Sequence, residues 1–398
     1  MFLHSAPMAF SRNGQIGRPH PQLHSVQLGT QPDAARGSAR GFRRNGRAPG
    51  QDIVVVASAD ERQLYFLTWF AIAFLTIVLH IVVSDEIVFA DAVQYLTYTD
   101  NLYFYRSGDW FIFEPFSKIM LLLLRASTGS TETTVGYAHY VISFVYLFGT
   151  LAIFRPSEAN WRGLIMAFAL YGSQLAFVTI RATPAYIIAS VAVMQAIRGQ
   201  NRAFLFTGLA IFFHISSVLA LIPILALFFK SKLTWLNFLQ KPRALIITFI
   251  LVGGIFVAAG STIFSATSSI LNSVPFLGKY LVFAVGMSDA GGVASITSRF
   301  AVGHFVLLVA ITIFLVAFLL LNDPRTRSVS IFLIVSYAFY VFTFFAFSPI
   351  AAFRQTPFWV LPAFSIFPWH KVGWRSIGHF VFLAVAGGMF AFQFSRVI

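Results

Sequence analysis

The chain has 398 residues, of which 58% are hydrophobic, 17% aromatic and 11% charged, and its formal net charge is +14. Long apolar runs on this scale exclude an ordinary soluble domain and predict a polytopic membrane protein. The absence of cysteine excludes disulfides, thiol catalysis and cysteine-ligated metals. Most basic residues fall in short loops or the N-terminal tail, where they act as topology signals, so the charge does not indicate a nucleic-acid partner.

The first 62 residues have the composition of a disordered segment. They are rich in Gly, Arg, Gln and Pro, show no helical or strand period, and contain an arginine cluster between Arg36 and Arg47. This composition predicts a disordered cytoplasmic tail over residues 1–62 that touches anionic lipid. No apolar run follows Met1, so we expect no signal peptide. Residues 63–398 are predicted to form one polytopic membrane domain.

The first predicted transmembrane helix is Leu64–Val83, and the arginines before it direct it from the cytoplasm outwards. The next segment, residues 84–114, is acidic and rich in tyrosine, and we expect it outside. Asp91 and Tyr95 would share a helix face there, and Glu114 closes the loop. Aromatic rings stack on sugars and carboxylates accept from hydroxyls, so this loop suits a sugar-binding surface. The alternative is an interfacial aromatic belt with solvated charges.

The remaining apolar runs predict an all-α, GT-C-like chain with about 10–12 membrane segments, several of them short or broken. Phe111–Leu124 is apolar but short, so we expect it to dip into the membrane and return. The other predicted segments are Tyr137–Phe154, Gly163–Ile180, Pro184–Ile197, Ala203–Phe213, Ser217–Phe229, Ala244–Phe264, Val302–Leu321, Val329–Phe347, Gln355–Pro368 and Ile377–Phe394.

Arg181 lies at a predicted break between two helices. Gly163–Ile180 is long enough to reach across most of a bilayer, and Thr183-Pro184 then interrupts it, because the residue before proline avoids the α region. Pro184 suits the first position of the next helix and Thr183 its N-cap. An arginine beside free helix N–H groups suits a phosphate or pyrophosphate. The alternative is an arginine that snorkels to the interface and caps carbonyls.

His214 lies near the middle of the apolar stretch Ala203–Phe229. One straight helix of that length would run roughly 40 Å, more than the roughly 30 Å core of a bilayer. Ser216 and Ser217 are good N-cap types, which favours two short half-helices that meet at His214. The alternative is a packing histidine in one long tilted helix.

The distribution of basic residues favours two half-helices over one long helix in residues 203–229. If residues 111–124 re-enter and residues 203–229 cross twice, all the basic loops fall on the cytoplasmic side, as the positive-inside rule requires. Arg181 and His214 then share the extracytoplasmic face. The basic loops contain Arg155 and Arg162, Arg198 and Arg202, Lys230 to Arg243, Arg325 and Arg327, and Lys371 and Arg375.

Two further outer segments are predicted to contribute arginines. The loop at 265–301 is rich in Ser, Thr and Gly, contains Arg299, and is long enough for a lid or binding loop. Residues 348–357 repeat the pattern around Arg181, with a break, Arg354 and a short helix led by proline. Discontinuous helices near a membrane face commonly build anion sites.

The outer face therefore combines arginines, one histidine and an acidic aromatic loop. The chain has no P-loop or dinucleotide fingerprint in a suitable context, and neither H-E-x-x-H nor G-x-S-x-G. The adjacent acids Asp85 and Glu86 are only a weak sign of a divalent ion. Arginines would stabilise the charge that develops on a diphosphate leaving group, and His214 would act as general base on an acceptor sugar hydroxyl.

Four short motifs in this order resemble the EpsG-like and Wzy-type polysaccharide polymerases of bacteria. They are D-x-x-x-Y at Asp91–Tyr95, E-P-F at Glu114–Phe116, I-R-x-x-x-A at Ile180–Ala185 and F-H-I-S-S at Phe213–Ser217, and the resemblance covers residues 84–229. The chain departs from the family at Ala182, where a glutamine usually stands, and in its long arginine-rich tail.

The resemblance implies a multi-pass enzyme of the bacterial inner membrane. It would join undecaprenyl-diphosphate-linked oligosaccharide units at the periplasmic face during exopolysaccharide, capsule or O-antigen synthesis. The family is regarded as metal-independent, so no metal and no cofactor is expected. Membrane lipid and a chain-length regulator of the export system are further expected partners, whereas nucleic acid is not.

The same resemblance assigns roles to individual residues. Arg181 would bind the diphosphate, and His214 would lie at the catalytic centre. Asp91, Tyr95 and Glu114 would face the sugar. The topology argument alone adds Arg299 and Arg354 as further substrate-binding residues.

Three other functions fit parts of the same pattern. A GT-C glycosyltransferase that uses a polyprenyl-monophosphate sugar would employ Asp85 and Glu86 and would depend on a metal. A lipid-linked oligosaccharide flippase or transporter would need a polar path through the membrane, whereas the polar residues concentrate on one face. A membrane O-acyltransferase would use His214 and would depend on an acyl donor.

Overall fold

The computed structural model describes residues 58–83, 92–100, 114–158, 160–272, 299–321, 323–327, 329–346, 349–373 and 377–394. Every secondary-structure element in these ranges is a helix, which confirms the all-α prediction. The contacts of the chain divide it into Met1–Gly46 and Arg47–Ile398, and all the described residues belong to the second unit.

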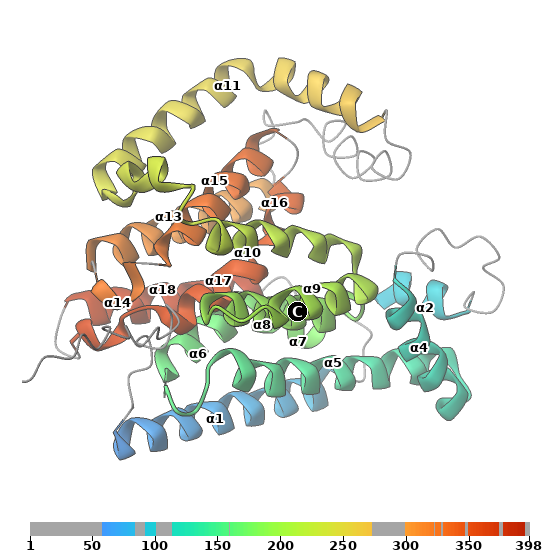
Figure 1. The fold of residues 1–398 in the computed structure, drawn as a ribbon. Coiled ribbons are helices and arrows are strands. Elements are labelled where there is room, and N and C mark those ends of the chain that lie inside the picture. The colour runs from blue at the N-terminus through green and yellow to red at the C-terminus, as the bar shows by residue number, and fades with distance from the viewer. Residues whose placement is uncertain are drawn as a thin grey trace, which may run out of the picture. The chain divides into compact units, whose positions relative to one another are not determined.

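The first half of the described chain contains the elements from α1 to α10 (Figure 1). They are α1 (Ala59–Val83), α2 (Ala92–Asp100), α4 (Pro115–Thr128), α5 (Thr131–Ile153), α6 (Trp161–Ala167), the π-helix η2 (Phe168–Gly172), α7 (Ser173–Phe177), α8 (Ala182–Ile197), α9 (Arg202–Phe213), the 3₁₀ helix η3 (Ile215–Ala220) and α10 (Leu221–Phe228).

The second half contains longer helices and a second broken segment. Its elements are the 3₁₀ helix η4 (Thr234–Gln240), α11 (Pro242–Asn272), α13 (Arg299–Leu321), α14 (Pro324–Arg327), α15 (Ser330–Ala346), α16 (Pro349–Gln355), α17 (Pro357–Ile366), the 3₁₀ turn η6 (Trp369–Lys371) and α18 (Ile377–Phe394).

Three helices in the described ranges are long and apolar enough to span a membrane: Ala59–Val82 in α1, Thr131–Ile153 in α5 and Gly303–Leu321 in α13. A fourth span is obtained if η4 and the first part of α11, which meet at 97°, are counted as one. The outer face of α1 exposes apolar side chains such as Phe70 at 62% and Phe74 at 70%, as a lipid-facing helix does. The predicted short segments are also present as apolar helices of 10–17 residues.

Side-chain contacts place the basic loops at one end of the helices, which we call the basic end. The Tyr65 hydroxyl at the start of α1 donates to the carbonyl oxygen of Phe154 after α5. Arg198 Nη2 lies 3.2 Å from Glu158 Oε1, and Arg162 Nη1 donates to the carbonyl oxygen of Trp369 at 2.9 Å. The chain segments at 154–162, 198 and 369 therefore lie together.

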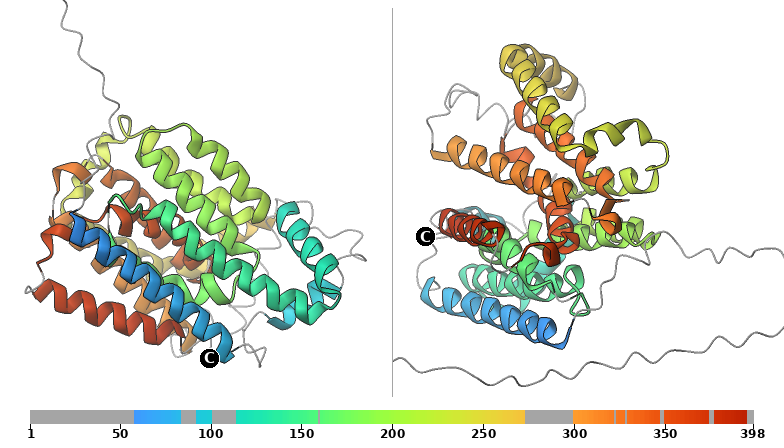
Figure 2. Two further views of the ribbon diagram at one scale, coloured as in Figure 1. Left: turned by 90° about the horizontal axis from the view of Figure 1, so that it is seen from below. Right: turned by 90° about the vertical axis from the view of Figure 1, so that its left-hand side faces the viewer.

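The opposite end gathers the breaks in the helices, and we call it the site end. His80 near the end of α1 hydrogen-bonds the Ser143 hydroxyl on α5, and Ser143 donates to the carbonyl oxygen of Ala176 in α7 at 2.6 Å. Helices α1 and α5 therefore run in opposite directions between the two ends, and Figure 2 shows them side by side. Helix α4 begins at Pro115, directly after Glu114, and is followed closely by the start of α5, so it stays at the site end.

Helix α8 is the buried centre of the described bundle. It contacts α5, α9, α10 and α17. Small residues such as Ala185, Ala189 and Ser190 are fully buried along it, which lets neighbouring helices approach closely. At Gly149 on α5 an added Cβ would lie 2.1 Å from Ile187 Cγ2 on α8, so these two helices pack closely enough to require a glycine. The rigid α8 fixes the position of Arg181, which directly precedes it.

Several predicted boundaries differ from the observed ones, among them the start of α8 and the end of α11. Helix α8 begins at Ala182, so Thr183 is not its N-cap and Pro184 is its third residue. The shift is tolerated because the N–H groups of a first helical turn have no intrahelical acceptor, so a proline there loses no bond. The Thr183 hydroxyl instead donates to the carbonyl oxygen of Leu175 at 2.8 Å.

The second wrong boundary concerns the predicted loop at 265–301. Helix α11 continues to Asn272, because residues 265–271 hold only Ser, Thr, Ala and apolar residues and no helix breaker. The serines at the predicted break near His214 do not cap a helix. Ser216 and Ser217 lie inside η3, which begins one residue after His214. The predicted half-helices on either side of His214 are confirmed as α9 and the η3–α10 pair.

Candidate functional site

Three interruptions of the helical structure meet at the site end. They are the start of α4 at Glu114, the connection of α7 to α8 at Arg181, and the extended residue His214 between α9 and η3. His214 has φ −156° and ψ 120°, so the chain is extended there and its side chain leaves the helical register. The site is therefore built from three separate parts of the chain.

The Glu114 carboxylate joins the other two residues. Its Oε2 lies 3.0 Å from Arg181 Nη1, and its Oε1 accepts a short hydrogen bond from His214 Nδ1. Each carboxylate oxygen thus has its own partner. The Glu114 side chain is only 5% exposed, compared with 19% for Arg181 and 13% for His214, so the three side chains interact with little screening by water.

The carboxyl group of Glu114 is held in its ionised form. Burial alone raises the pKa of this group. The hydrogen bond with His214, the charges of His214 and Arg181 and the backbone N–H of Ile215 lower it by more, so the pKa lies below its ordinary value of 4.5. Glu114 is therefore a carboxylate at neutral pH and accepts hydrogen bonds only.

The ionised Glu114 fixes the tautomer of His214. Because the carboxylate can only accept, His214 Nδ1 must carry a hydrogen, and in the neutral ring the lone pair is then on Nε2. Among the described residues, the hydrogen bond of the ring is made by Nδ1, and none is found for Nε2. A histidine whose Nδ1 is held by a carboxylate and whose Nε2 is open has the arrangement of a general base.

Arg181 has contacts beyond Glu114. Its guanidinium carbon lies 6.0 Å from the centroid of the Tyr95 ring, and its backbone N–H donates weakly to the Tyr95 hydroxyl at 3.5 Å. Tyr95 lies on α2 and is 5% exposed. The predicted site residues Tyr95, Glu114, Arg181 and His214 are therefore brought together, although their roles remain predictions.

Ser117 was not among the predicted site residues. Its hydroxyl donates to the carbonyl oxygen of Phe213 at 2.7 Å and lies 3.4 Å from the carbonyl oxygen of Arg181. It is fully buried and ties the first turn of α4 to the two breaks that carry Arg181 and His214. A serine three residues after the E-P-F glutamate has no distinctive pattern in the sequence, so only the structure identifies it.

Tyr186 is a second unpredicted member of the site. It is one turn into α8, it is buried, and its ring packs edge-on against the His214 ring at 6.0 Å between centroids. Its hydroxyl also lies within electrostatic range of Arg354, the last arginine of the short helix α16. Arg354 is half-buried. The repeated break pattern at residues 348–357 thus brings a second arginine towards the same site.

The remaining predicted residues are not described at side-chain level. Asp91 and the pair Asp85 and Glu86 lie outside the described residues. Arg299 is the first residue of α13, and its side chain also lies outside the described part of the structure.

The described arrangement supplies three chemical capacities. His214 Nε2 can take a proton from a hydroxyl, Glu114 can stabilise the imidazolium that forms, and Arg181 and Arg354 bring positive charge for an anion. Comparison of the chain with protein-family models, with curated proteins and with solved structures found no match.

Proposed function

We propose that the chain is a membrane glycosyltransferase that joins lipid-diphosphate-linked oligosaccharide units, a polysaccharide polymerase of the bacterial inner membrane with a GT-C-like architecture. The observation that carries the proposal is the pairing of Glu114 with both His214 and Arg181. It combines a general base with positive charge at one point, between broken helices of an apolar protein.

His214 would activate the acceptor. The terminal sugar of one lipid-linked unit presents a hydroxyl to His214 Nε2, which removes the proton as the oxygen attacks the anomeric carbon of the other unit. The glycosidic bond to the diphosphate breaks, and the lipid diphosphate leaves with its bonding electron pair. Glu114 stabilises the protonated ring throughout, in the manner of the carboxylate of a catalytic triad.

Arginines would stabilise the leaving diphosphate. Arg181 uses Nη1 for Glu114, and its planar guanidinium carries five N–H donors in a geometry that matches phosphate oxygens. Arg354, whose charge acts on Tyr186, would add a second positive charge. The base and the anion-binding arginine would then contact different oxygens of one carboxylate, which suits a reaction that forms one bond and releases an anion.

The location of the site at the end opposite to the basic loops also supports this function. The basic loops gather at one end and Arg181, Glu114 and His214 at the other. With the basic end in the cytoplasm, as the positive-inside rule requires, the site end is extracytoplasmic. Lipid-linked units that have been flipped across the membrane would be joined on that side.

The experiment is complementation of a strain from which the gene has been deleted. The strain receives wild type, His214→Ala, Glu114→Gln or Arg181→Ala, and polymer ladders, lipid-linked single units and membrane levels of the protein are measured. We expect each variant to lose long polymer while single units accumulate. Two matched controls at the basic end, the exposed Arg202→Ala and the half-exposed His370→Ala, should keep the wild-type ladder.

Other functions give different results in the same strain. Loss of the gene without any change in polymer would exclude the polymerase. A base of this kind would also serve acyl transfer to a sugar hydroxyl, in which case polymer length would stay normal and its acyl content would fall. A transporter would leave single units on the cytoplasmic leaflet, where an extracellular glycosidase cannot reach them.

A further inference from the structure

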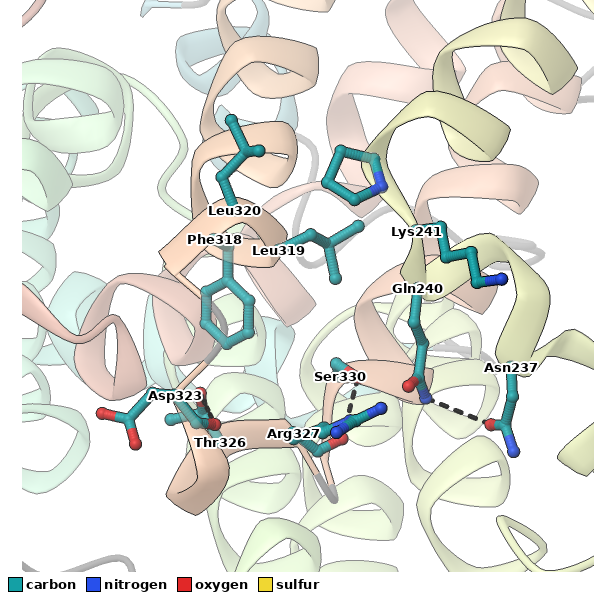
Figure 3. A pocket seen from close by; sticks show the side chains of 11 residues that line it. Asn237, Gln240, Lys241, Phe318, Leu319, Leu320, Asp323, Thr326, Arg327 and Ser330 are labelled. Atoms are coloured by element: carbon teal, nitrogen blue, oxygen red, sulfur yellow. Dashed lines mark hydrogen bonds between the residues drawn. The ribbon is translucent and has the colours of Figure 1, made fainter.

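A partly polar cavity lies at the basic end, away from Glu114. It has a volume of about 340 Å³ and is formed where η4 meets α11 and where α13 is followed by α14 and α15 (Figure 3). Lys371 Nζ donates to the carbonyl oxygen of Leu321 at 2.9 Å, and His370 lies 3.4 Å from Asp323, so the cavity belongs to the end that holds the basic loops.

The charge inside the cavity is positive. Lys241 and Arg327 line it, and within the described residues neither side chain has a hydrogen bond or an ion pair. The acid in the lining, Asp323, has its carboxylate engaged by His370, and Figure 3 shows that carboxylate directed away from Arg327. Two cations therefore face the cavity, and no carboxylate of the described residues pairs with either of them.

Amide side chains add neutral donors beside the two cations. Gln240 Nε2 donates to Asn237 Oδ1 at 3.1 Å (Figure 3), which orients both amides. The amide group of Asn237 and the second hydrogen of Gln240 Nε2 remain available to a ligand. Cations together with amide donors are the groups that bind phosphate oxygens in proteins.

The other wall of the cavity is apolar and leads towards the lipid-facing side of the helices. Phe318, Leu319 and Leu320 come from the end of α13, and Leu320 is 66% exposed. Helix α11 begins at the cavity and exposes Ile247 at 57%. Trp235 on η4 is 68% exposed, and aromatic residues of this kind mark the membrane–water interface.

We propose that this cavity binds the phosphate headgroup of an anionic phospholipid, with Lys241 and Arg327 on the phosphate and the acyl chains along the exposed faces of α11 and α13. A soluble phosphate compound would satisfy the cations but would leave the apolar wall without a partner. The combination of a phosphate group and hydrocarbon chains matches both walls. This site does not depend on the function proposed for Glu114 and His214.

The test uses the full chain, purified in a neutral detergent. The midpoint of thermal unfolding is followed while dioleoyl-phosphatidylglycerol, dioleoyl-phosphatidylcholine or inorganic phosphate is added, because a ligand that binds the folded state raises the midpoint. We expect phosphatidylglycerol to raise the midpoint saturably. The double variant Lys241→Gln, Arg327→Gln should need roughly 30-fold more of this lipid for the same rise.

A matched double variant controls for net charge. Lys232→Gln with Arg202→Gln removes the same charge from exposed positions at the same end, outside the cavity, and should respond like wild type. Equal responses of the two double variants would overturn the proposal. Two other results would also contradict the proposal. If inorganic phosphate alone raised the unfolding midpoint fully, the cavity would bind a soluble anion. If phosphatidylcholine raised the midpoint as much as phosphatidylglycerol, the two cations would have no role in lipid binding.

A second measurement does not depend on thermal stability. The phosphatidylglycerol that remains bound after purification is quantified by mass spectrometry for wild type and both double variants. Wild type and the control pair should retain it in a fixed ratio to protein, and the cavity variant should lose most of it. Equal retention in all three would contradict the proposal even if the cavity variant were less stable.

Discussion

Glu114 and His214 are 100 positions apart in the chain, yet Glu114 Oε1 accepts the Nδ1 hydrogen of His214 inside the protein. The second oxygen of the same carboxylate is occupied by Arg181. A carboxylate can serve both donors because it has two accepting oxygens, whereas an amide of the same shape has only one. This difference makes Glu114→Gln an informative substitution.

In Glu114→Gln the amide oxygen is expected to turn to Arg181, because a guanidinium can only donate. The amide NH₂ then faces His214 Nδ1 and forces the hydrogen to Nε2, so the base has the wrong tautomer. We expect polymer formation in reconstituted membranes to fall by about 10²–10⁴-fold, similar to His214→Ala. The ¹⁵N chemical shifts of the His214 ring should show the exchange of tautomers.

A purely structural role for Glu114 would give a different pattern. Activity would then fall in proportion to the loss of folded protein, and the ¹⁵N shifts of the remaining folded protein would match those of wild type. Glu114→Asp keeps both oxygens and the charge, so it should preserve the wild-type tautomer even where its shorter reach reduces activity.

The stability of the protein should depend on pH through Glu114. The pKa of its carboxyl is below 4.5 in the folded protein, so between the folded and unfolded pKa values the unfolded chain binds more protons. The stabilisation by Glu114 is therefore complete above about pH 4.5 and is lost as the pH falls towards the folded pKa. The measurement is the thermal midpoint of wild type and Glu114→Gln in detergent between pH 7 and pH 3.5.

We expect the midpoint of wild type to exceed that of Glu114→Gln at pH 7 and the gap to narrow below about pH 4.5. The exposed acid Glu132 on α5 provides the control, since Glu132→Gln should show no comparable gap. A gap for Glu114→Gln that stays constant down to pH 3.5 would show that the ionisation of Glu114 does not stabilise the fold.

The close packing of α5 against α8 should make Gly149 intolerant of a side chain. An alanine Cβ there would lie 2.1 Å from Ile187 Cγ2, so one helix must move, at a cost of about 1–3 kcal/mol. Ile187→Ala in the same protein should recover part of the loss. Gly136→Ala on the same helix meets no atom within 4 Å and should leave the midpoint unchanged or slightly higher. Equal thermal unfolding midpoints for Gly149→Ala and Gly136→Ala would contradict the close packing of α5 against α8 at Gly149.

Asn160 links the start of α6 to the end of α17. Its amide both accepts and donates hydrogen bonds, and substitutions can separate the two contributions to stability. Its Oδ1 accepts from the Gly163 N–H at 2.9 Å, and its Nδ2 donates to the carbonyl oxygens of Phe364 at 2.9 Å and Ser365 at 2.6 Å. Asn160→Asp keeps the helix cap but places a carboxylate beside two carbonyls. We expect it to lower stability by about 1–3 kcal/mol, at least as much as Asn160→Ala. If Asn160→Asp had the thermal unfolding midpoint of wild type, the hydrogen bond accepted from Gly163 would account for the whole contribution of Asn160 to stability.

The breaks at Arg181 and His214 could be predicted because local chemistry causes them. Pro184 cannot continue the preceding helix, because it lacks the N–H that would bond one turn back, and an apolar stretch of 27 residues exceeds one crossing. The exact start of α8 could not be predicted in this way, since a proline is tolerated anywhere in a first helical turn. The prediction therefore missed the boundary by the two residues Ala182 and Thr183.

The contacts of Glu114 could not be predicted, because they depend on how α4 packs against α9 and not on any spacing within the chain. The resemblance placed Glu114 towards the sugar, whereas the structure shows its two oxygens occupied by Arg181 and His214. Ser117 and Tyr186 were missed for the same reason. A serine and a tyrosine in apolar helices become notable only when their partners are known.

Ser117 couples the position of α4 to that of α9. The same first turn of α4 carries Glu114, and the Ser117 hydroxyl holds the carbonyl oxygen of Phe213 at the end of α9. Any outward swing of α4 therefore withdraws the carboxylate from both His214 and Arg181 in one movement. Movement of this helix and loss of the Glu114–His214 contact would be a single cooperative event, so the proposed general base would be held ready only while α4 is packed against α9.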